Sequence, residues 1–349
     1  MGAAATDVLI RGAGPAGCLL ALALRDSGLG AAVLDHNSVA SFRPVALSYA
    51  SRLILERVGV WQAIDATPLE RILVTQAGGF GRTLLEAADA GVPALGYVTD
   101  YAAVATALRE QARTFLTAEA RAARCVVHAE GWSEDATEKA YRQHAVVGLL
   151  RSDPPASTTA FERFTAEGPL ALLPLAGRYA LVWSTAPQRA QALAQASEQE
   201  FLTALAAACG GAPGRLLGVE RRAVQPLVLR VRRTRVAPRA VYIGNAAQTL
   251  HPVAGQGLNL ALRDAWELAA SLHGAADPGD AALLARYAAR RRLDAGATIR
   301  ATDLLAGAFL GGGRLARVAR GAALTALDIL PGPRRFFARR MIFGPSALP

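Results

Sequence analysis

A glycine-rich turn between two short apolar segments constrains the fold of this chain more than any other feature. Gly12-Ala13-Gly14-Pro15-Ala16-Gly17 follows the run Val8–Ile10, and an alanine- and leucine-rich helix is expected over Cys18–Arg25. A second strand is expected over Ala31–Leu34, and it ends at Asp35. Strand, glycine turn, helix and strand with a terminal acid is the order of a Rossmann-like unit, which binds a dinucleotide.

Each residue type in this turn has a physical purpose. Gly12 makes the tight turn, Gly14 permits close approach of a pyrophosphate, and Gly17 lets the helix pack on the strand. Ala16 lies at the helix start, where the helix dipole and free N–H groups favour an anion. Asp35, 23 residues after Gly12, is placed to accept hydrogen bonds from ribose hydroxyls. An ordinary βαβ turn without a ligand is the alternative.

A second segment rich in glycines and amides lies late in the chain. Gly244-Asn245 follows a strand expected at Ala240–Ile243, and His251-Pro252 leads to Gly255-Gln256-Gly257-Leu258-Asn259. A helix is expected at about 257–273. The simpler interpretation is a polar loop that caps this helix, with a loop histidine. The density of glycines and amides exceeds what a cap needs, and a helix N-terminus stabilises negative charge on a bound group.

Composition favours a folded protein in a reducing compartment. Hydrophobic residues make up 52% of the chain and charged residues 19%, which excludes extensive disorder. The three cysteines form no CxxC pair, and no Cys/His cluster has ligand spacing, so neither disulfides nor a metal are expected. The strand expected at Asp7–Arg11 leaves no room for a signal peptide. The uncharged stretch Ala240–Leu262 contains too many polar residues for a membrane span.

The middle of the chain shows a different pattern. A helical pattern covers Gln188–Cys209, and a further helix is expected at about Asp280–Leu305. The order predicts a nucleotide-binding domain that is interrupted by a sheet domain and completed by the strand Ala240–Ile243. Antiparallel strands separated by turns are expected at Gln143–Leu150, Thr159–Thr165, Leu170–Leu175 and Tyr179–Ser184.

The C-terminal segment carries part of the net charge of +10. One interpretation is a basic helix that packs its apolar side on the body of the protein. The other is contact with an anionic membrane surface, where each cation adds roughly 1 kcal/mol. Nucleic acid is not expected as a partner, because no recognition motif accompanies the charge. The residues concerned are Arg314, Arg317, Arg320, Arg334, Arg335, Arg339 and Arg340, with Phe336, Phe337, Met341, Ile342 and Phe343.

The chain resembles the class A flavoprotein monooxygenases, and among them the ubiquinone-biosynthesis hydroxylases of the 2-octaprenyl-6-methoxyphenol hydroxylase branch. The segments Thr159–Phe164 and Gly168–Pro174 are similar to substrate-domain strands of that branch. The motifs that carry the resemblance are Gly12–Gly17 with Asp35, Arg43–Ser48, and Gly244–Asn259 with Arg263-Asp264.

This resemblance implies an α/β fold. A Rossmann-like FAD-binding domain, residues 1–60, 95–133 and 236–300, would be interrupted by an antiparallel-sheet substrate domain, residues 61–94 and 134–235. A C-terminal helical tail, residues 301–349, would follow. The chain would be cytoplasmic and peripheral to the inner membrane, with subunits of a ubiquinone-biosynthesis complex as further partners.

The resemblance also implies the cofactor, the reaction and the site. NAD(P)H would reduce bound FAD, and O2 would then supply the oxygen that hydroxylates a prenylated phenol. Arg43 would face the flavin side of FAD, and Gly244-Asn245 would lie at the pyrophosphate and ribityl chain. The ADP half would be held by Gly12, Gly14, Ala16, Gly17 and Asp35. The residues beside the isoalloxazine ring would be His251, Pro252 and Gln256, as catalytic residues, with Gly255, Gly257, Leu258 and Asn259.

One mid-chain motif departs from the family pattern. These hydroxylases carry an Asp-Gly pair after a short strand, where this chain has Glu130-Gly131. The preceding stretch, Arg113 to Cys125, is also shorter than the strands that the family places there. The alternative function is therefore a catalytically impaired paralogue that acts as a membrane-associated scaffold or partner in the same pathway.

Overall fold

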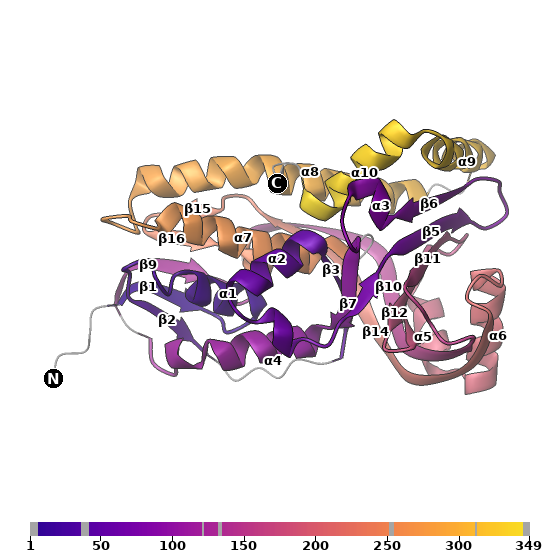
Figure 1. Ribbon diagram of the computed structural model, residues 1–349, viewed down its shortest axis with the longest axis horizontal. Helices are drawn as coiled ribbons and strands as arrows, with labels where there is room; N and C mark the ends of the chain where they lie inside the picture. Colours follow the sequence, from indigo (N-terminus) through magenta and orange to yellow (C-terminus); the bar gives the residue numbers. More distant parts are fainter. Residues whose placement is uncertain are drawn as a thin grey trace.

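The computed structural model describes residues 6–35, 42–120, 122–131, 135–250, 255–310 and 313–344, and for 301–310 and 314 it describes the backbone alone. Its strands form three sheets, which lie in two layered halves joined by long strands and helices (Figure 1).

The first half is built on a six-stranded sheet in the order β15-β16-β9-β1-β2-β8. Neighbouring strands run parallel except at the edge pair β15–β16. The strand expected at Ala240–Ile243 joins this sheet beside β9. The bounds are β1 (Thr6–Arg11), β2 (Ala31–Leu34), β8 (Leu116–Thr117), β9 (Ala123–His128), β15 (Val236–Ala237) and β16 (Ala240–Tyr242).

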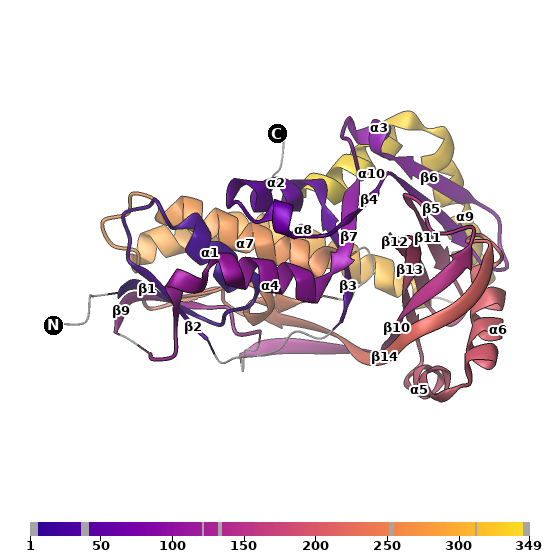
Figure 2. The same cartoon turned by 60° about the horizontal axis from the view of Figure 1, so that its bottom comes forward.

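Helices cover one face of this sheet (Figures 1 and 2). Alternate strand residues, including Val8, Ile10 and Val127, point into a core shared with these helices, as the twofold alternation of strands requires. The 30-residue helix α8 packs on α7. The bounds are α1 (Pro15–Ala23), α2 (Tyr49–Arg57), α4 (Tyr101–Gln111), α7 (Gln256–Leu272) and α8 (Ala281–Leu310).

The second half is an eight-stranded sheet in the order β17-β14-β10-β13-β12-β11-β5-β6. Its pairs are antiparallel except β11–β5. The bounds are β5 (Arg71–Gln76), β6 (Arg82–Glu86), β10 (Ala136–Asp153), β11 (Thr159–Phe164), β12 (Pro169–Leu175), β13 (Arg178–Thr185), β14 (Arg215–Arg232) and β17 (Gln248–Thr249).

Two helices pack on one face of the eight-stranded sheet, α5 (Pro187–Gln195) and α6 (Glu198–Cys209). The helical pattern over Gln188–Cys209 therefore forms two helices. Ser197 begins a new helix, because its side chain accepts from the N–H of Glu200 while the Glu200 carboxylate accepts from the N–H of Ser197. The N–H groups in the first turn of a helix have no acceptor within the helix, and this capping box supplies acceptors for two of them.

A small antiparallel sheet, β3 (Pro44–Ser48), β7 (Gly96–Asp100) and β4 (Thr67–Leu69), joins the two halves. The tail forms α9 (Arg314–Ile329), which packs on β6, and α10 (Pro331–Phe343), which packs on α3 (Ala87–Ala90). The expected α/β architecture with a helical tail is confirmed. Among the described helices, none combines the length and hydropathy that crossing a bilayer requires.

Candidate functional site

The glycine turn is held together by backbone packing. A Cβ atom on Gly17 would lie 2.0 Å from the carbonyl oxygen of Gly12, so helix α1 sits directly on the end of β1. Gly12 adopts φ +108, and a Cβ there would meet the backbone of Ala129 and Glu130 at 2.8 Å. Only glycine satisfies both positions.

Gly14 differs from its two neighbours in the motif. It is the N-cap of α1, with φ −74 and no capping side chain. No described atom lies within 4 Å of a Cβ built on it. Space is therefore open beside the start of α1, which leaves room for an anion at the helix N-terminus. Ala16 is buried in the same helix, and its Cβ lies against Gly244.

Asp35 at the end of β2 is fixed by two contacts. Its backbone N–H donates to the carbonyl oxygen of Thr117, at 3.0 Å. Its carboxylate forms an ion pair with Arg109 of α4. The hydrogen bond to Asp35 raises the pKa of Arg109 more than any other contact does. Arg109 was not anticipated from the sequence, because 74 residues separate it from Asp35 and no motif links them.

Glu130, which replaces the family aspartate, lies against the glycine turn. Its carboxylate is 3.6 Å from the Arg11 guanidinium and 3.1 Å from Nδ1 of His128. Burial raises the pKa of Glu130, but the hydrogen bonds and the positive charge of Arg11 outweigh burial and lower it overall. Arg11, which interrupts an apolar strand in the sequence, is explained by this carboxylate. In the short segment that follows Arg113, the structure has a 3-10 helix and β8.

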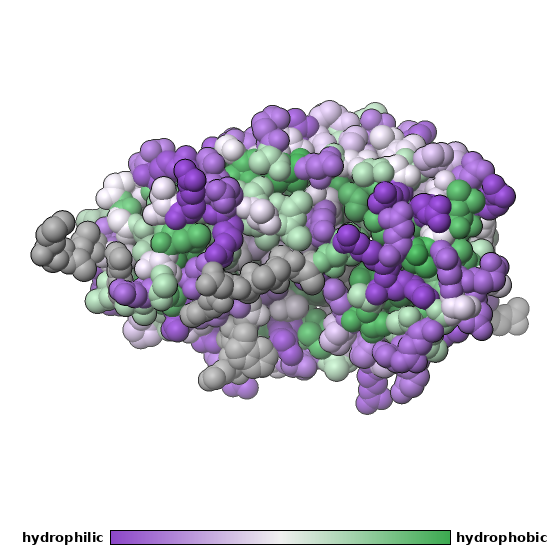
Figure 3. Space-filling model, turned by 90° about the horizontal axis from the view of Figure 1, so that it is seen from below, coloured by the Kyte–Doolittle hydropathy of each residue, from purple (hydrophilic) through white to green (hydrophobic). Residues whose placement is uncertain are grey.

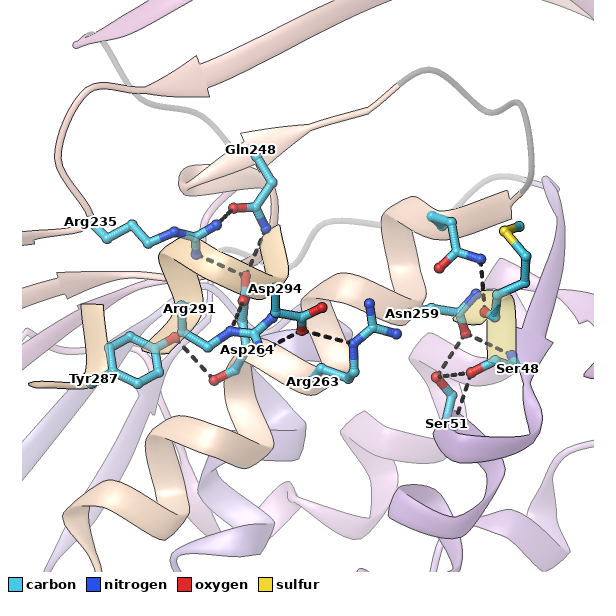
Figure 4. A network of polar contacts seen from close by, with 12 residues as sticks. Ser48, Ser51, Arg235, Gln248, Asn259, Arg263, Asp264, Tyr287, Arg291 and Asp294 are labelled. Atoms are coloured by element: carbon cyan, nitrogen blue, oxygen red, sulfur yellow. Dashed lines mark hydrogen bonds and ion pairs between the residues drawn. The ribbon is translucent and has the colours of Figure 1, made fainter. Parts of the chain in front are cut away.

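The second motif is organised around a buried carboxylate, Asp264 of α7 (Figure 4). It accepts hydrogen bonds from the N–H of Gly244 at 3.2 Å and from Nε2 of Gln248 at 2.7 Å. Arg235 and Arg291 form ion pairs with it at 3.3 and 2.8 Å. Burial raises the pKa of Asp264, but these two arginines overcome that effect and hold the pKa below its usual range.

The network extends along α7 and α8 through a second acid. Arg291 contacts Asp294 at 2.6 Å, and Nε of Arg263 contacts the same carboxylate at 3.2 Å (Figure 4). All three side chains are almost completely buried. Gly344, which follows α10, packs against the side chains of Arg263 and Asp294. The Arg263-Asp264 dipeptide of the motif therefore fixes α7 against α8 and the tail.

Asn259 ties the start of α7 to the segment that contains Arg43–Ser48. Its Oδ1 accepts from the Ser48 N–H and from the Ser51 hydroxyl, at 2.8 and 2.7 Å. Its Nδ2 donates to the carbonyl oxygens of Ala46 and Gly255, both at 2.8 Å. Four protein contacts saturate this buried side chain, so its contribution to a ligand site is to position the backbone around it.

The remaining α7 residues divide into buried and open positions. Gly255 adopts φ +59, and a Cβ atom added to it would lie 3.4 Å from the Cβ of Ala46. A Cβ atom added to Gly257 would have no described atom within 4 Å. Leu258 is partly buried against the core between the six-stranded sheet and its helices. The Gln256 side chain is buried and donates to the Met341 carbonyl oxygen of α10, at 3.3 Å.

The other sequence-derived candidates fall at the margins of this arrangement. The Arg43 N–H donates to Asp100, and its guanidinium lies 4.0 Å above the Tyr101 ring. Asn245, next to Gly244, is exposed. His251 and Pro252 lie outside the described residues. The structure thus brings Gly244 against Ala16, joining the two glycine motifs, and binds Asn259 to the strand that follows Arg43.

The chain matches the family model described as "FAD binding domain" over residues 5–136 and 125–302. The ubiquinone hydroxylase UbiL of Rhodospirillum rubrum is 30% identical, with 95% of this chain and 88% of that protein covered. The 3-demethoxyubiquinol 3-hydroxylase of Escherichia coli is 28% identical over 83% of this chain and 86% of that protein. An uncharacterized protein of Synechocystis is 30% identical over 97% and 93%.

Solved structures share the fold at lower identity. The p-nitrophenol 4-monooxygenase PnpA of Pseudomonas putida has a TM-score of 0.77 at 16% identity, covering 97% of this chain and 98% of that one. Klebsiella pneumoniae HpxO, in complex with FAD and uric acid, has a TM-score of 0.75 at 16% identity, with 98% of both chains covered. Sequence motifs, fold and relatives agree: the chain belongs to the FAD-binding-domain family of flavin-dependent monooxygenases, together with the ubiquinone hydroxylases.

Proposed function

We propose that this chain hydroxylates a prenylated phenol in ubiquinone biosynthesis, using FAD, NAD(P)H and O2. The observation that carries the proposal is the contact between the two glycine motifs at Ala16 and Gly244, with open space beside Gly14 in one motif and beside Gly257 in the other. Relatives that cover 95% and 83% of the chain are named ubiquinone hydroxylase UbiL and 3-demethoxyubiquinol 3-hydroxylase. Their relationship favours turnover over the scaffold role.

The residues fit FAD. The N–H groups at the start of α1, beyond Gly14, would hold the pyrophosphate, and Asp35 would hold the ribose of the ADP half. Asn245 and the backbone of Gly244 would approach the ribityl chain, with Arg43 on the flavin side. When bound, FAD supplies the redox chemistry that activates O2 for ring hydroxylation. We assign the FAD-binding domain to residues 1–60, 95–133 and 236–300, and the substrate domain to 61–94 and 134–235.

The chain's own contribution is positioning. The N-terminus of α7 at Gln256-Gly257 directs N–H groups towards one place, where a developing negative charge is stabilised by the helix dipole. Asn259 ties that terminus to β3 through buried hydrogen bonds, and Asp264 holds Gly244 and Gln248 against the same helix. We assign His251, Pro252 and Gln256 to the region beside the ring, where they would exclude water and orient the substrate.

Product analysis tests the proposal. Purified protein with FAD, NADPH and a detergent-solubilised prenylated phenol should give a product 16 mass units heavier, from insertion of one oxygen atom. In ¹⁸O2 the label should appear in that product. A protein that binds FAD yet shows neither phenol-stimulated NAD(P)H oxidation nor hydrogen peroxide release would contradict the hydroxylase and support the scaffold.

We also propose that the tail contacts an anionic membrane surface, which would give access to a prenylated substrate. The apolar side of α10 is used internally, since Ala338, Ile342 and Phe343 pack with Leu85. Another set of apolar residues faces outward in this part of the chain. They are Leu315, Val318, Ile329, Leu330 and Phe336, with exposed fractions between 47% and 84%.

Charge lies beside these apolar side chains. Arg335 and Arg339 are exposed on either side of Phe336. The tail helices run along the upper side of the molecule, and the opposite face mixes hydrophilic and hydrophobic residues without one apolar surface (Figures 1 and 3). Apolar side chains flanked by arginines suit insertion at the level of lipid headgroups.

Vesicle sedimentation tests the membrane contact. Arg335→Glu with Arg339→Glu should reduce binding to phosphatidylglycerol vesicles at least about tenfold, because each cation contributes roughly 1 kcal/mol. Arg113→Glu with Arg233→Glu, at side chains 74% and 76% exposed elsewhere, makes the same charge change and should have little effect. Equal binding by both double variants would contradict the proposal.

A further inference from the structure

The eight-stranded sheet has one face that its own helices leave uncovered. Along β12, Leu170 and Leu172 are buried in the cluster with α5 and α6. The intervening residues Ala171, Leu173 and Leu175 point to the other face and remain partly accessible. Along β12 the second face is therefore apolar and incompletely covered.

Glu162 lies on this second face. Its neighbour in β11, Phe161, packs with the helix-side cluster, so the twofold alternation of the strand directs Glu162 the opposite way. The register places Glu162 between Val74 of β5 and Ala171 of β12. The same row continues through Val182 to Val147 of β10, and Glu162 is its only charged residue.

The Glu162 carboxyl has an unusual environment. Removal from water raises its pKa, although the residue keeps part of its accessible surface. Within the part of the chain that the structure describes, no hydrogen bond or ion pair reaches this carboxyl. A desolvated carboxylate without a partner destabilises a fold. Its position therefore suits a ligand that brings a hydrogen-bond donor.

The surroundings of this face limit what such a ligand is. At one edge, α9 crosses over, since Thr83 of β6 donates to the Leu324 carbonyl oxygen at 2.6 Å. Towards the other half, β13 contacts β3, and Asn259 links β3 to the start of α7. The apolar row thus begins beside the tail helix α9 and crosses β13, which contacts the strand that Asn259 ties to α7.

We propose that Glu162 accepts a hydrogen bond from the phenol hydroxyl of the substrate, while the partly accessible row from Val74 to Val182 contacts its ring and prenyl chain. This assignment rests on the proposed function and names a substrate-binding residue within it. One carboxylate in an apolar surface matches a molecule with one hydroxyl on an apolar body. The ionised carboxylate only accepts hydrogen bonds, so it selects the free phenol over its methyl ether, which has no proton to donate.

Binding of a matched ligand pair to the FAD-loaded protein tests this inference. The probes are 2-geranylphenol and its methyl ether, followed by the change in the flavin absorption spectrum. Wild type should bind the phenol about 10- to 100-fold more tightly, the range for a hydrogen bond to a charged group. Glu162→Leu should bind both equally, and Glu162→Gln should retain a smaller preference. The surface variant Glu138→Gln should behave as wild type.

Each outcome has a distinct meaning. If Glu162→Leu or Glu162→Gln keeps the full preference of wild type, the inference is overturned and the proposed function stands. If FAD-loaded wild type binds neither compound, the proposed substrate class fails. Because the carboxyl has no described protein partner, Glu162→Leu should melt at the same or a higher temperature. A clear fall in Tm would assign Glu162 a structural role and overturn the inference.

Discussion

The two glycine motifs of the candidate FAD site obtain their geometry in opposite ways. At Gly12 and Gly17 the geometry depends on missing side chains, because backbone atoms occupy the space where Cβ atoms would be. From Gly244 to Asp264 the geometry depends on side chains that are present, above all Asn259 and Asp264, which are buried and saturated with hydrogen bonds. The first region should fail when atoms are added, and the second when hydrogen-bonding groups are removed.

Gly17→Val should have the largest effect. Its Cβ would lie 2.0 Å from the Gly12 carbonyl oxygen, so helix and strand must separate, at a cost above the ~1–3 kcal/mol of ordinary overpacking. We expect loss of FAD binding and a much lower urea midpoint. Retention of wild-type stability would show that the turn does not depend on this close contact.

Asp264→Asn should be the most damaging change in the second region. It removes a buried negative charge from between Arg235 and Arg291, which costs about 3–5 kcal/mol. Urea denaturation measures the free energy of unfolding. Asp277→Asn breaks an exposed pair with Arg239 and should cost about 1 kcal/mol or less. Similar losses for both variants would refute the importance of burial.

Gly257→Val tests an open position within the second region. No described atom lies near its Cβ, so the fold should tolerate the side chain. The valine would project into the place assigned to the flavin ring. We expect phenol-stimulated NAD(P)H oxidation to fall on the order of 100-fold, as for a misplaced reacting group, with a smaller loss of FAD affinity. Unchanged turnover would contradict the placement of the flavin ring beside α7.

Asp35→Ala should have the smallest effect of the four, mainly on FAD affinity. Loss of a charged acceptor weakens binding by ~1.5–3 kcal/mol, about 10- to 100-fold in FAD affinity. Arg109→Leu should weaken FAD binding less, because the Asp35 carboxylate remains and loses only its ion pair with Arg109. FAD fluorescence titration of both variants ranks them. A larger loss for Arg109→Leu would assign the ribose contact to the arginine.

The sequence predicted what local patterns determine. The glycine turn, its flanking strands, the late strand and the helix after Gly255 follow from short-range spacing, and the structure confirms them. The buried contacts did not follow from such spacing. Asn259 meets Ser48 across 211 residues, and Asp264 meets Arg291 across 27. No local period reports pairs like these, because the fold alone brings them together.

Two further features have causes in the local sequence. The break between α5 and α6 follows from the Ser197–Glu200 capping box, a recognisable spacing inside an alanine-rich helical pattern. Arg11 and Glu130 each depart from the expected pattern, and each accounts for the other as an ion pair. Two departures at the carboxyl ends of neighbouring strands were thus one feature.

FAD titration of Gly14→Val tests the central claim most directly. The wild-type position has φ −74, which valine adopts, and no described atom near its Cβ, so Tm should stay within a few degrees of wild type. The side chain would fill the place assigned to the pyrophosphate. Wild type should show saturable quenching of FAD fluorescence, and the variant should lose affinity by about 100-fold or more, since direct steric overlap with a ligand exceeds the ~1.5–3 kcal/mol of one charged hydrogen bond. Equal FAD affinity in the two folded proteins would contradict the account.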